Sequence, residues 1–294
     1  MTLPSGQELL QLNRAGLTYS ELAKRYGSTR GTVARAIANA KKGVRKTEAK
    51  FQRVRLGAPF ALKGDAMIVG DVHVPTTDYQ LARMVGTIAE KHLTAPRKLI
   101  IAGDMFNFDS FSMYAPVIHA PSMRDELEAA RQLMHDWLEV FAEIYVLMGN
   151  HDRRLQKWSA AEFEAADIFS MITTDQRVKV SNFGWCTLDT PGGRYRITHS
   201  RNYSVNAGTV AGELANKYQC HIICHHQHHL CKTLDRWKRY VCIDNGGLFD
   251  VEQLAYVVLD DSKSPGMAQG FTMLRDGSPT LFGKFPFEDW TRWV

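Results

Sequence analysis

Short runs of consecutive apolar residues alternate with longer segments of helical spacing between residue 64 and about residue 250. The apolar runs are 66–70, 98–103, 143–149, 194–199, 220–225 and 239–244, and the helical segments lie near 78–93, 121–142, 153–171 and 205–218. A strand that is apolar at successive positions is buried on both faces, as in layered α/β domains. The pattern therefore predicts an α/β fold over residues 64–294.

The beginning of the chain has a different pattern. Apolar residues recur at helical spacing over residues 5–42, which predicts short helices there. The following stretch, 43–63, is rich in Lys and Arg, contains Gly and Pro, and has few periodic apolar positions. We therefore expect a small helical domain at 1–42, a basic linker at 43–63 and one large domain at 64–294.

Composition bears on the cellular compartment of the protein. The 294 residues are 45% apolar, and no apolar run approaches the roughly 18–20 residues of a membrane span. The first twelve residues lack the apolar core of a signal peptide, and the five cysteines form no CxxC pair. These features predict a cytoplasmic protein with no membrane partner.

The net charge of +5 is unevenly distributed. Residues 1–63 contain 13 Lys and Arg and three acidic residues, a net charge of +10, whereas the remainder contains 23 basic and 28 acidic residues, a net charge of −5. A basic segment attached to a mildly acidic body indicates an anionic partner for that segment.

Polar side chains follow five of the apolar runs. The runs end in Gly70-Asp71-Val72-His73, Gly103-Asp104-Met105-Phe106-Asn107, Gly149-Asn150-His151-Asp152, His199-Ser200 and Cys224-His225-His226-Gln227-His228-His229. The carboxyl ends of strands are where α/β sheets place their sites. Residues two apart share one side of an extended chain, which pairs Asp71 with His73 and His226 with His228. Asp, Asn and His without thiolates suit Mn²⁺, Fe or Zn²⁺ in a hydrolytic site.

In their order and context, these motifs resemble the signature of the calcineurin-like metallophosphoesterase superfamily over about residues 65–250. The resemblance implies a four-layer αββα sandwich that binds two divalent metal ions, with Mn²⁺ as the first choice and Fe or Zn²⁺ as alternatives. It further implies the ligands of both ions. Asp71, His73 and His228 would hold one ion, Asn150, His199 and His226 would hold the other, and Asp104 would bridge them.

The resemblance also implies a reaction. A hydroxide bridging the two metals would attack phosphorus in line with the leaving oxygen. His151 would act near the leaving group as a general acid or charge stabiliser. Asp152 would either orient His151 through a hydrogen bond to its ring or support the site from behind.

Two departures from the family pattern bear on the substrate. His225 stands where the family has Gly before the H-x-H pair. Asn107 stands where protein phosphatases have Asp, and Phe108-Asp109 follows it in place of Arg-Gly, which disfavours a phosphoprotein substrate. DNA-repair exonucleases of the superfamily have His at the Asn107 position, so we expect Asn107 to donate to a phosphate.

Arginines beside the motifs are further candidates for phosphate binding. Arg153 and Arg154 follow Asp152, and Arg201 follows His199 after one residue. A guanidinium can reach phosphate oxygens from any of these positions. The alternative is that they are solvated residues at a helix start and in a loop.

Residues 19–37 resemble a helix-turn-helix. Leu22 and Ala23 fit the inner face of its first helix, Gly27 fits the turn, and Ser28 or Thr29 caps the second helix. That helix would offer Thr29, Arg30, Thr32 and Arg35 to DNA, with Lys41 and Lys42 on phosphates. The alternative is a helical module for protein binding or oligomerisation, and a homodimer is compatible with either reading.

Together these features predict a binuclear metal-dependent phosphodiesterase, foremost a DNA nuclease, with DNA preferred over RNA as partner. The architecture is typical of phage, mobile-element or repair proteins. One alternative is a phosphatase or small-nucleotide phosphodiesterase whose basic head only localises it. Another is a DNA-binding regulator with an inactive metal domain.

Overall fold

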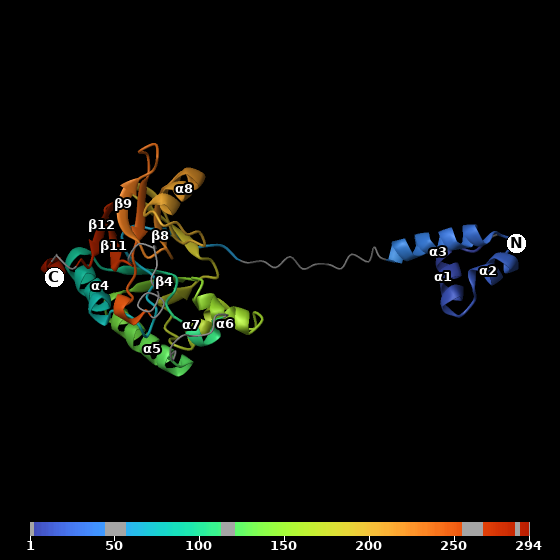
Figure 1. The fold of residues 1–294 in the computed structure, drawn as a ribbon, viewed down its shortest axis with the longest axis horizontal. Coiled ribbons are helices and arrows are strands. Elements are labelled where there is room, and N and C mark those ends of the chain that lie inside the picture. Colours follow the sequence, from blue (N-terminus) through green and yellow to red (C-terminus); the bar gives the residue numbers. More distant parts are fainter. Residues whose placement is uncertain (1–2, 45–56, 113–120, 255–266, 286–288, 294) are drawn as a thin grey trace. The chain divides into compact units, whose positions relative to one another are not determined.

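The structure, a computed structural model, describes residues 3–44, 57–112, 121–254, 267–285 and 289–293. The chain forms two compact units, one within residues 1–56 and one within 57–294, which we describe separately (Figure 1). None of the helices in the described ranges combines the length and the apolar character needed to cross a bilayer.

The first unit is built from three helices, α1 (Gly6–Arg14), α2 (Tyr19–Arg25) and α3 (Arg30–Val44). Capping boxes start the first two: Ser5 pairs with Glu8, and Thr18 pairs with Glu21. Gly27 has a φ of +62° in the turn before α3, and the Thr32 N–H donates to Thr29 Oγ1 at 3.2 Å. A small core closes the unit, formed by Leu9, Leu10, Leu22, Ala23, Val33 and Ile37.

The second unit contains two six-stranded sheets. The first has the strand order β12-β11-β2-β3-β4-β5, and the second has the order β1-β6-β7-β8-β10-β9. The first sheet consists of β2 (Ala66–Val69), β3 (Lys98–Ala102), β4 (Glu143–Leu147), β5 (Val178–Val180), β11 (Gly270–Arg275) and β12 (Ser278–Gly283). The second consists of β1 (Ala61–Lys63), β6 (Trp185–Thr190), β7 (Gly193–His199), β8 (His221–His225), β9 (Leu230–Leu234) and β10 (Val241–Asn245).

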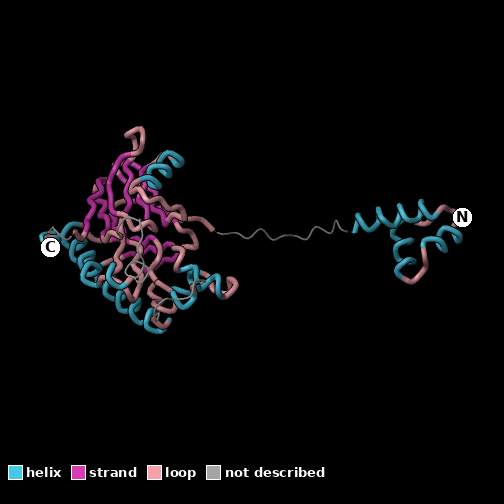
Figure 2. The backbone as a smooth tube through the Cα atoms, in the orientation of Figure 1, coloured by secondary structure: helices cyan, strands magenta, loops and turns pink. Residues whose placement is uncertain are grey.

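Helices flank the two sheets. They are α4 (Tyr79–His92), α5 (Met123–Val140), α6 (Asp152–Trp158), α7 (Ala165–Ser170) and α8 (Thr209–Tyr218), with short 3₁₀ turns at Asp109–Phe111, Val251–Gln253 and Trp290–Trp293. In Figure 1, α4 and α5 lie on one side of the body and α8 on the other. Figure 2 shows the strands between these helical layers. This is the predicted sandwich of two sheets flanked by helices.

Alternating side chains explain why the central strands are apolar at successive positions. Met67 and Val69 of β2 pack into the core under α4 and α5, whereas Ala66 and Ile68 pack between the two sheets. In β8, Ile223 enters the layer between the sheets, and its neighbours Ile222 and Cys224 pack under α8. Both faces of these strands are therefore buried, as the sequence pattern indicates.

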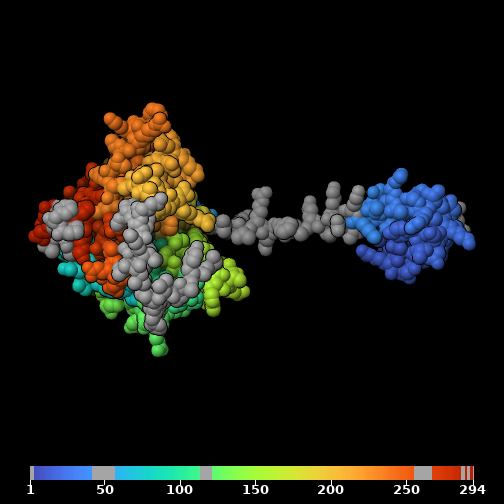
Figure 3. All heavy atoms as spheres, viewed as in Figure 1, coloured from blue at the N-terminus to red at the C-terminus, as the bar shows by residue number. Residues whose placement is uncertain are grey.

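The structure differs from the expected elements at several places. The segment 153–171 forms two helices, because α6 ends at Trp158 and the following loop places Ala160 and Ala161 at positive φ. Strand β1 lies inside the stretch expected to be linker and pairs in parallel with β6. The C-terminal strands complete the first sheet, with β11 antiparallel to β2 and packed beside α4. Figure 3 shows the C-terminal residues, in red, at the surface of this unit.

Candidate metal centre

The carboxyl ends of β2, β3, β4, β7 and β8 bring the predicted ligands together. Their donor atoms form three overlapping groups in which all atoms lie within 4.8 Å of one another: Asp71, His73 and His228; His73, Asp104 and His151; and Asp104, His199 and His226. Asn150 joins the third group through its Oδ1, 2.9 Å from His199 Nε2. The structure thus collects the seven predicted ligands and His151 in one cluster.

Asp71 anchors one side of this cluster. Its Oδ1 lies 3.1 Å from His228 Nε2 and 3.9 Å from His73 Nε2. Its Oδ2 accepts the His226 N–H at 3.1 Å and lies 3.3 Å from Nδ1 of the buried His225. His225, which replaces the family glycine, therefore lies against the Asp71 carboxylate, although its Nδ1 has no hydrogen-bond partner among the described residues.

Asp104 lies between the two sides. Its Oδ2 is 3.2 Å from His199 Nε2 and 4.0 Å from His73 Nε2, and its Oδ1 accepts the His151 N–H at 2.8 Å. The carboxylate is almost completely buried, at 1% exposure. One carboxylate that reaches a donor on each side is suited to bridge two cations.

The imidazoles are oriented for binding a cation. Asn107 Oδ1 lies 3.2 Å from His73 Nδ1, and the Ala102 carbonyl lies 3.0 Å from His199 Nδ1, so each Nδ1–H has an acceptor. Each Nε2 is left to face Asp104. His73 Nε2 is buried and has no hydrogen-bond partner among the described residues. A buried imidazole lone pair beside carboxylates fits a divalent metal ion.

The protonation states favour the same ligands. Although burial opposes it, the neighbouring histidines hold the pKa of Asp104 below its ordinary value, and His228 and His225 do the same for Asp71. Burial lowers the pKa of His73 to about 3 and also lowers the pKa of His226. Against the effect of burial, Asp104 raises the pKa of His199 to about 9, so a cation bound there must displace a proton.

The backbone at the site adopts a conformation that side chains rarely take. Asp71, His73, Asp104, His226 and His228 all have φ between +47° and +91°. Such conformations cost of order 1–3 kcal/mol each and concentrate at functional sites. Gly149 allows the chain to approach Asp104 closely, because a Cβ there would collide with the Asp104 backbone and carboxylate. Backbone strain at these positions thus accompanies the convergence of the side chains on one point.

Among the described hydrogen bonds, Asp152 contacts backbone N–H groups and not the His151 ring. It is fully buried and accepts the N–H groups of Asp104 and Gly149 at 2.8 Å and of Phe106 at 3.2 Å. Burial and the nearby Asp104 raise the pKa of Asp152 to about 7. Its place in the structure is to join the loops that follow β3 and β4.

The His151 ring lies against His73, with ring centroids 4.6 Å apart. Its Nδ1 is 2.9 Å from the Asn107 carbonyl, and its Nε2 is 3.2 Å from Arg154 Nη2. Burial lowers the pKa of His151 below its ordinary value. His151 is therefore at the centre, but its Nε2 faces an arginine of the same chain.

The candidate substrate residues differ in their surroundings. The Asn107 amide is engaged on both sides, since Oδ1 faces His73 and Nδ2 donates to Asp109, so Asn107 orients His73 in this structure. Arg153 donates to the Asn182 carbonyl and the Gln156 side chain. Arg201 is exposed. Burial, together with the positive charge of Arg201, lowers the pKa of Arg153.

Glu126 was not among the residues expected from the sequence. It is completely buried, and its Oε2 accepts the N–H groups of Asn107 at 3.1 Å and Phe108 at 2.6 Å. Its Oε1 has no hydrogen-bond partner among the described residues. Burial raises the pKa of Glu126 to about 8. Glu126 thus fixes the loop that positions Asn107.

Glu126→Gln is expected to flatten the pH dependence of stability. The native carboxyl stays protonated up to about pH 8, whereas the unfolded carboxyl ionises near 4.5, so its contribution is complete below pH 4.5 and is lost as the pH rises toward 8. Glutamine keeps the acceptor oxygen and cannot ionise. Thermal unfolding should show the wild-type melting temperature falling more than that of the variant between about pH 6 and about pH 9. Equal decreases in the two proteins would contradict the assignment.

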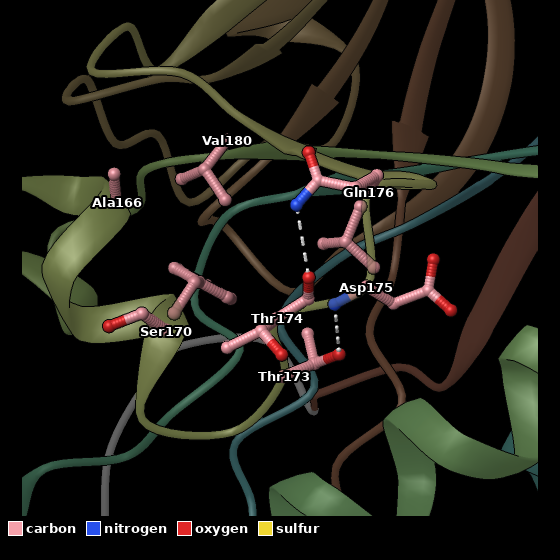
Figure 4. Close-up of a pocket in the computed structure, with 9 residues that line it drawn as sticks. Ala166, Ser170, Thr173, Thr174, Asp175, Gln176 and Val180 are labelled. Carbon is pink, nitrogen blue, oxygen red and sulfur yellow. Dashed lines mark hydrogen bonds between the residues drawn. The ribbon is translucent and has the colours of Figure 1, made fainter.

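A pocket elsewhere on the body holds none of the candidate residues. It is lined by Ala166, Phe169, Ser170, Thr173, Thr174, Asp175, Gln176, Val178 and Val180, from α7, β5 and the loop between them (Figure 4). The loop is closed by its own hydrogen bonds, from the Asp175 N–H to Thr173 Oγ1 and from Gln176 Nε2 to the Thr174 carbonyl. We assign no chemistry to this pocket.

Solved structures similar to the chain include a Thermotoga maritima protein determined by solution NMR (14% identity, 75% of this chain and 98% of that chain, TM-score 0.35). They also include a Vps29 mutant from Entamoeba histolytica (10% identity, 75% of this chain and 98% of that chain, TM-score 0.36). A hypothetical protein from Pyrococcus horikoshii is a third (7% identity, 78% of this chain and 91% of that chain, TM-score 0.44).

No curated protein matches the chain. Residues 66–251, more than half of its length, match the family of calcineurin-like phosphoesterases. This range contains the five strand ends that build the centre, with its candidate sites for metal ions. The chain belongs to the calcineurin-like phosphoesterase family.

Proposed function

We propose that the protein is a binuclear metal-dependent phosphodiesterase that cleaves nucleic acid, with DNA as the preferred substrate. The observation that carries the proposal is a buried cluster for two cations in the same chain as a compact helical unit with an exposed basic helix. Two bound divalent ions would supply Lewis acidity to the phosphate and lower the pKa of a coordinated water. The remaining contributions come from the chain's own residues.

The centre is arranged to hold its ligands rigidly. Asp104 bridges the two sides, Asn107 and Ala102 orient His73 and His199, and Asp152 joins the supporting loops. Arg153 and Arg201 place positive charge at the segments that follow β4 and β7. We propose Arg201 as a phosphate contact because it is exposed and no described residue is hydrogen-bonded to its side chain.

Helix α3 supports the preference for nucleic acid. Val33 and Ile37 are buried in the core of the helical unit, whereas Thr29, Arg30, Thr32, Arg35 and Lys41 are exposed. These exposed side chains are therefore free to contact a phosphate backbone. The Thr29 and Thr32 hydroxyls lie 2.9 Å apart at the start of α3. The side chain of Lys42, also predicted to bind DNA, lies outside the described residues.

The neighbourhood of Asn107 supports a diester over a phosphoprotein. Asn107, Phe108 and Asp109 stand where protein phosphatases carry Asp-Arg-Gly, so the arginine of that motif is missing. Arg154 occupies this neighbourhood instead, bonded to Asp109 and the Asn107 carbonyl. The surroundings of Asn107 therefore differ from the Asp-Arg-Gly segment of a protein phosphatase.

A substrate panel tests the proposal. The full chain with Mn²⁺ should cleave single- or double-stranded DNA and bis(p-nitrophenyl) phosphate faster than RNA, p-nitrophenyl phosphate or a phosphopeptide. Hydrolysis of monoesters alone, with DNA intact under Mn²⁺, Zn²⁺ and Fe²⁺, would instead favour a phosphatase. DNA binding with no hydrolysis of any ester would favour a regulator with an inactive centre.

A further inference from the structure

Arg154 lies beside the metal centre and is held there by hydrogen bonds to neighbouring residues. It belongs to the first turn of α6, the helix that begins directly after His151 (Figure 1). Its Nη1 donates to Asp109 Oδ1 at 2.6 Å and to the Asn107 carbonyl at 2.9 Å. Its Nη2 lies 3.2 Å from His151 Nε2. The guanidinium and the His151 ring thus share the Asn107 carbonyl, and the guanidinium also reaches the Nε2 atom of that ring.

The partners of His151 determine where its proton lies. Nδ1 faces the Asn107 carbonyl, which only accepts, so Nδ1 carries the hydrogen. Nε2 faces a guanidinium, which only donates, so Nε2 offers its lone pair. Both nitrogens of a neutral ring are then engaged. The positive charge at this edge of the centre belongs to Arg154.

Arg154 retains donors for a ligand. A guanidinium has five N–H groups, and the three contacts to Asp109, Asn107 and His151 use three of them. No described residue accepts from Nε or from the second Nη2 hydrogen. The side chain is 20% exposed, so it is accessible from solvent while its ion pair fixes it in place. A held guanidinium with spare donors suits the oxygens of a phosphate.

We propose that Arg154 binds a non-bridging oxygen of the substrate phosphate at this centre, with Asp109 and His151 fixing its guanidinium. This assignment rests on the proposed phosphodiesterase function and names the residue that supplies fixed positive charge to the substrate. In addition to its expected role near the leaving group, His151 would then position Arg154.

The test measures binding of phenylphosphonate, a phosphate mimic that cannot be hydrolysed at an ester bond, to the Mn²⁺-loaded full chain by calorimetry. Arg154→Ala should weaken binding about tenfold or more, the range of a lost charged hydrogen bond, and Arg154→Lys should weaken it less. Arg177→Ala is the matched control, because Arg177 also pairs with an aspartate and a backbone carbonyl. Manganese content and melting temperature establish that each variant is folded and loaded.

The outcomes separate the two proposals. Equal affinity of the Arg154→Ala and Arg177→Ala proteins, or no binding by the wild type, would overturn the role of Arg154. If binding depends on Arg154 while DNA and diesters stay intact, the nuclease proposal fails and the phosphate site stands.

Discussion

Asp104→Asn is expected to reduce Mn²⁺-dependent hydrolysis of bis(p-nitrophenyl) phosphate by at least about 100-fold. Asp104 belongs to two of the three ligand groups and contacts His199 and His73 through the same oxygen. An amide of the same size removes the negative charge shared by the two cations, so affinity for both should fall. The measurement is kcat/KM together with the manganese content of the dialysed protein.

Asp175→Asn is a suitable control, since Asp175 pairs with Arg177 at the protein surface away from the centre. This variant should keep wild-type activity and metal content. An Asp104→Asn protein that matched the control in both measurements would show that the bridging carboxylate is dispensable.

Removing residues 1–56 is expected to weaken DNA binding by about tenfold or more at moderate salt. The truncation deletes the exposed cations Arg30, Arg35 and Lys41, so the slope of log affinity against log salt should decrease by about 3. The second unit keeps its own cores and the whole metal cluster, so hydrolysis of the small diester should be unchanged. Fluorescence anisotropy between about 50 and about 200 mM salt measures the effect.

Substitution within the full chain refines this test. The double variant Arg30→Ala with Arg35→Ala should reproduce most of the loss, because both side chains are exposed on α3. Arg14→Ala, on α1, is the control and should bind DNA nearly as tightly as the wild type. Unchanged affinity and salt slope after truncation would assign the helical unit another role, such as protein binding.

The central strands could be predicted from the sequence because a strand that is buried on both faces has consecutive apolar residues. In β2, β3 and β8, consecutive apolar residues face two different cores. The edge strands were missed for the opposite reason. β5 has no fully buried residue, and β9 is half-buried to exposed along its length, so their pairing with β4 and β10 determines their conformation.

In the candidate site, too, some residues could be predicted from the sequence and others could not. The clustering of the candidate ligands could be predicted because each of them follows a recognisable strand, and the strand ends meet at one edge. The supporting residues could not. Glu126 reaches the Asn107 loop from the first turn of α5, and His225 and Arg154 contact residues that other elements bring beside them. Such contacts depend on packing between elements, which residue spacing does not encode.

The stoichiometry of metal binding tests the central claim most directly. Equilibrium dialysis of the full chain against Mn²⁺, followed by elemental analysis, should find about two ions per chain, as a clamp on phosphate requires. His228→Ala and His199→Ala should each reduce this value, because the two histidines lie in different ligand groups. A wild-type protein that binds one ion or none under saturating Mn²⁺, Zn²⁺ or Fe²⁺ would contradict the binuclear centre.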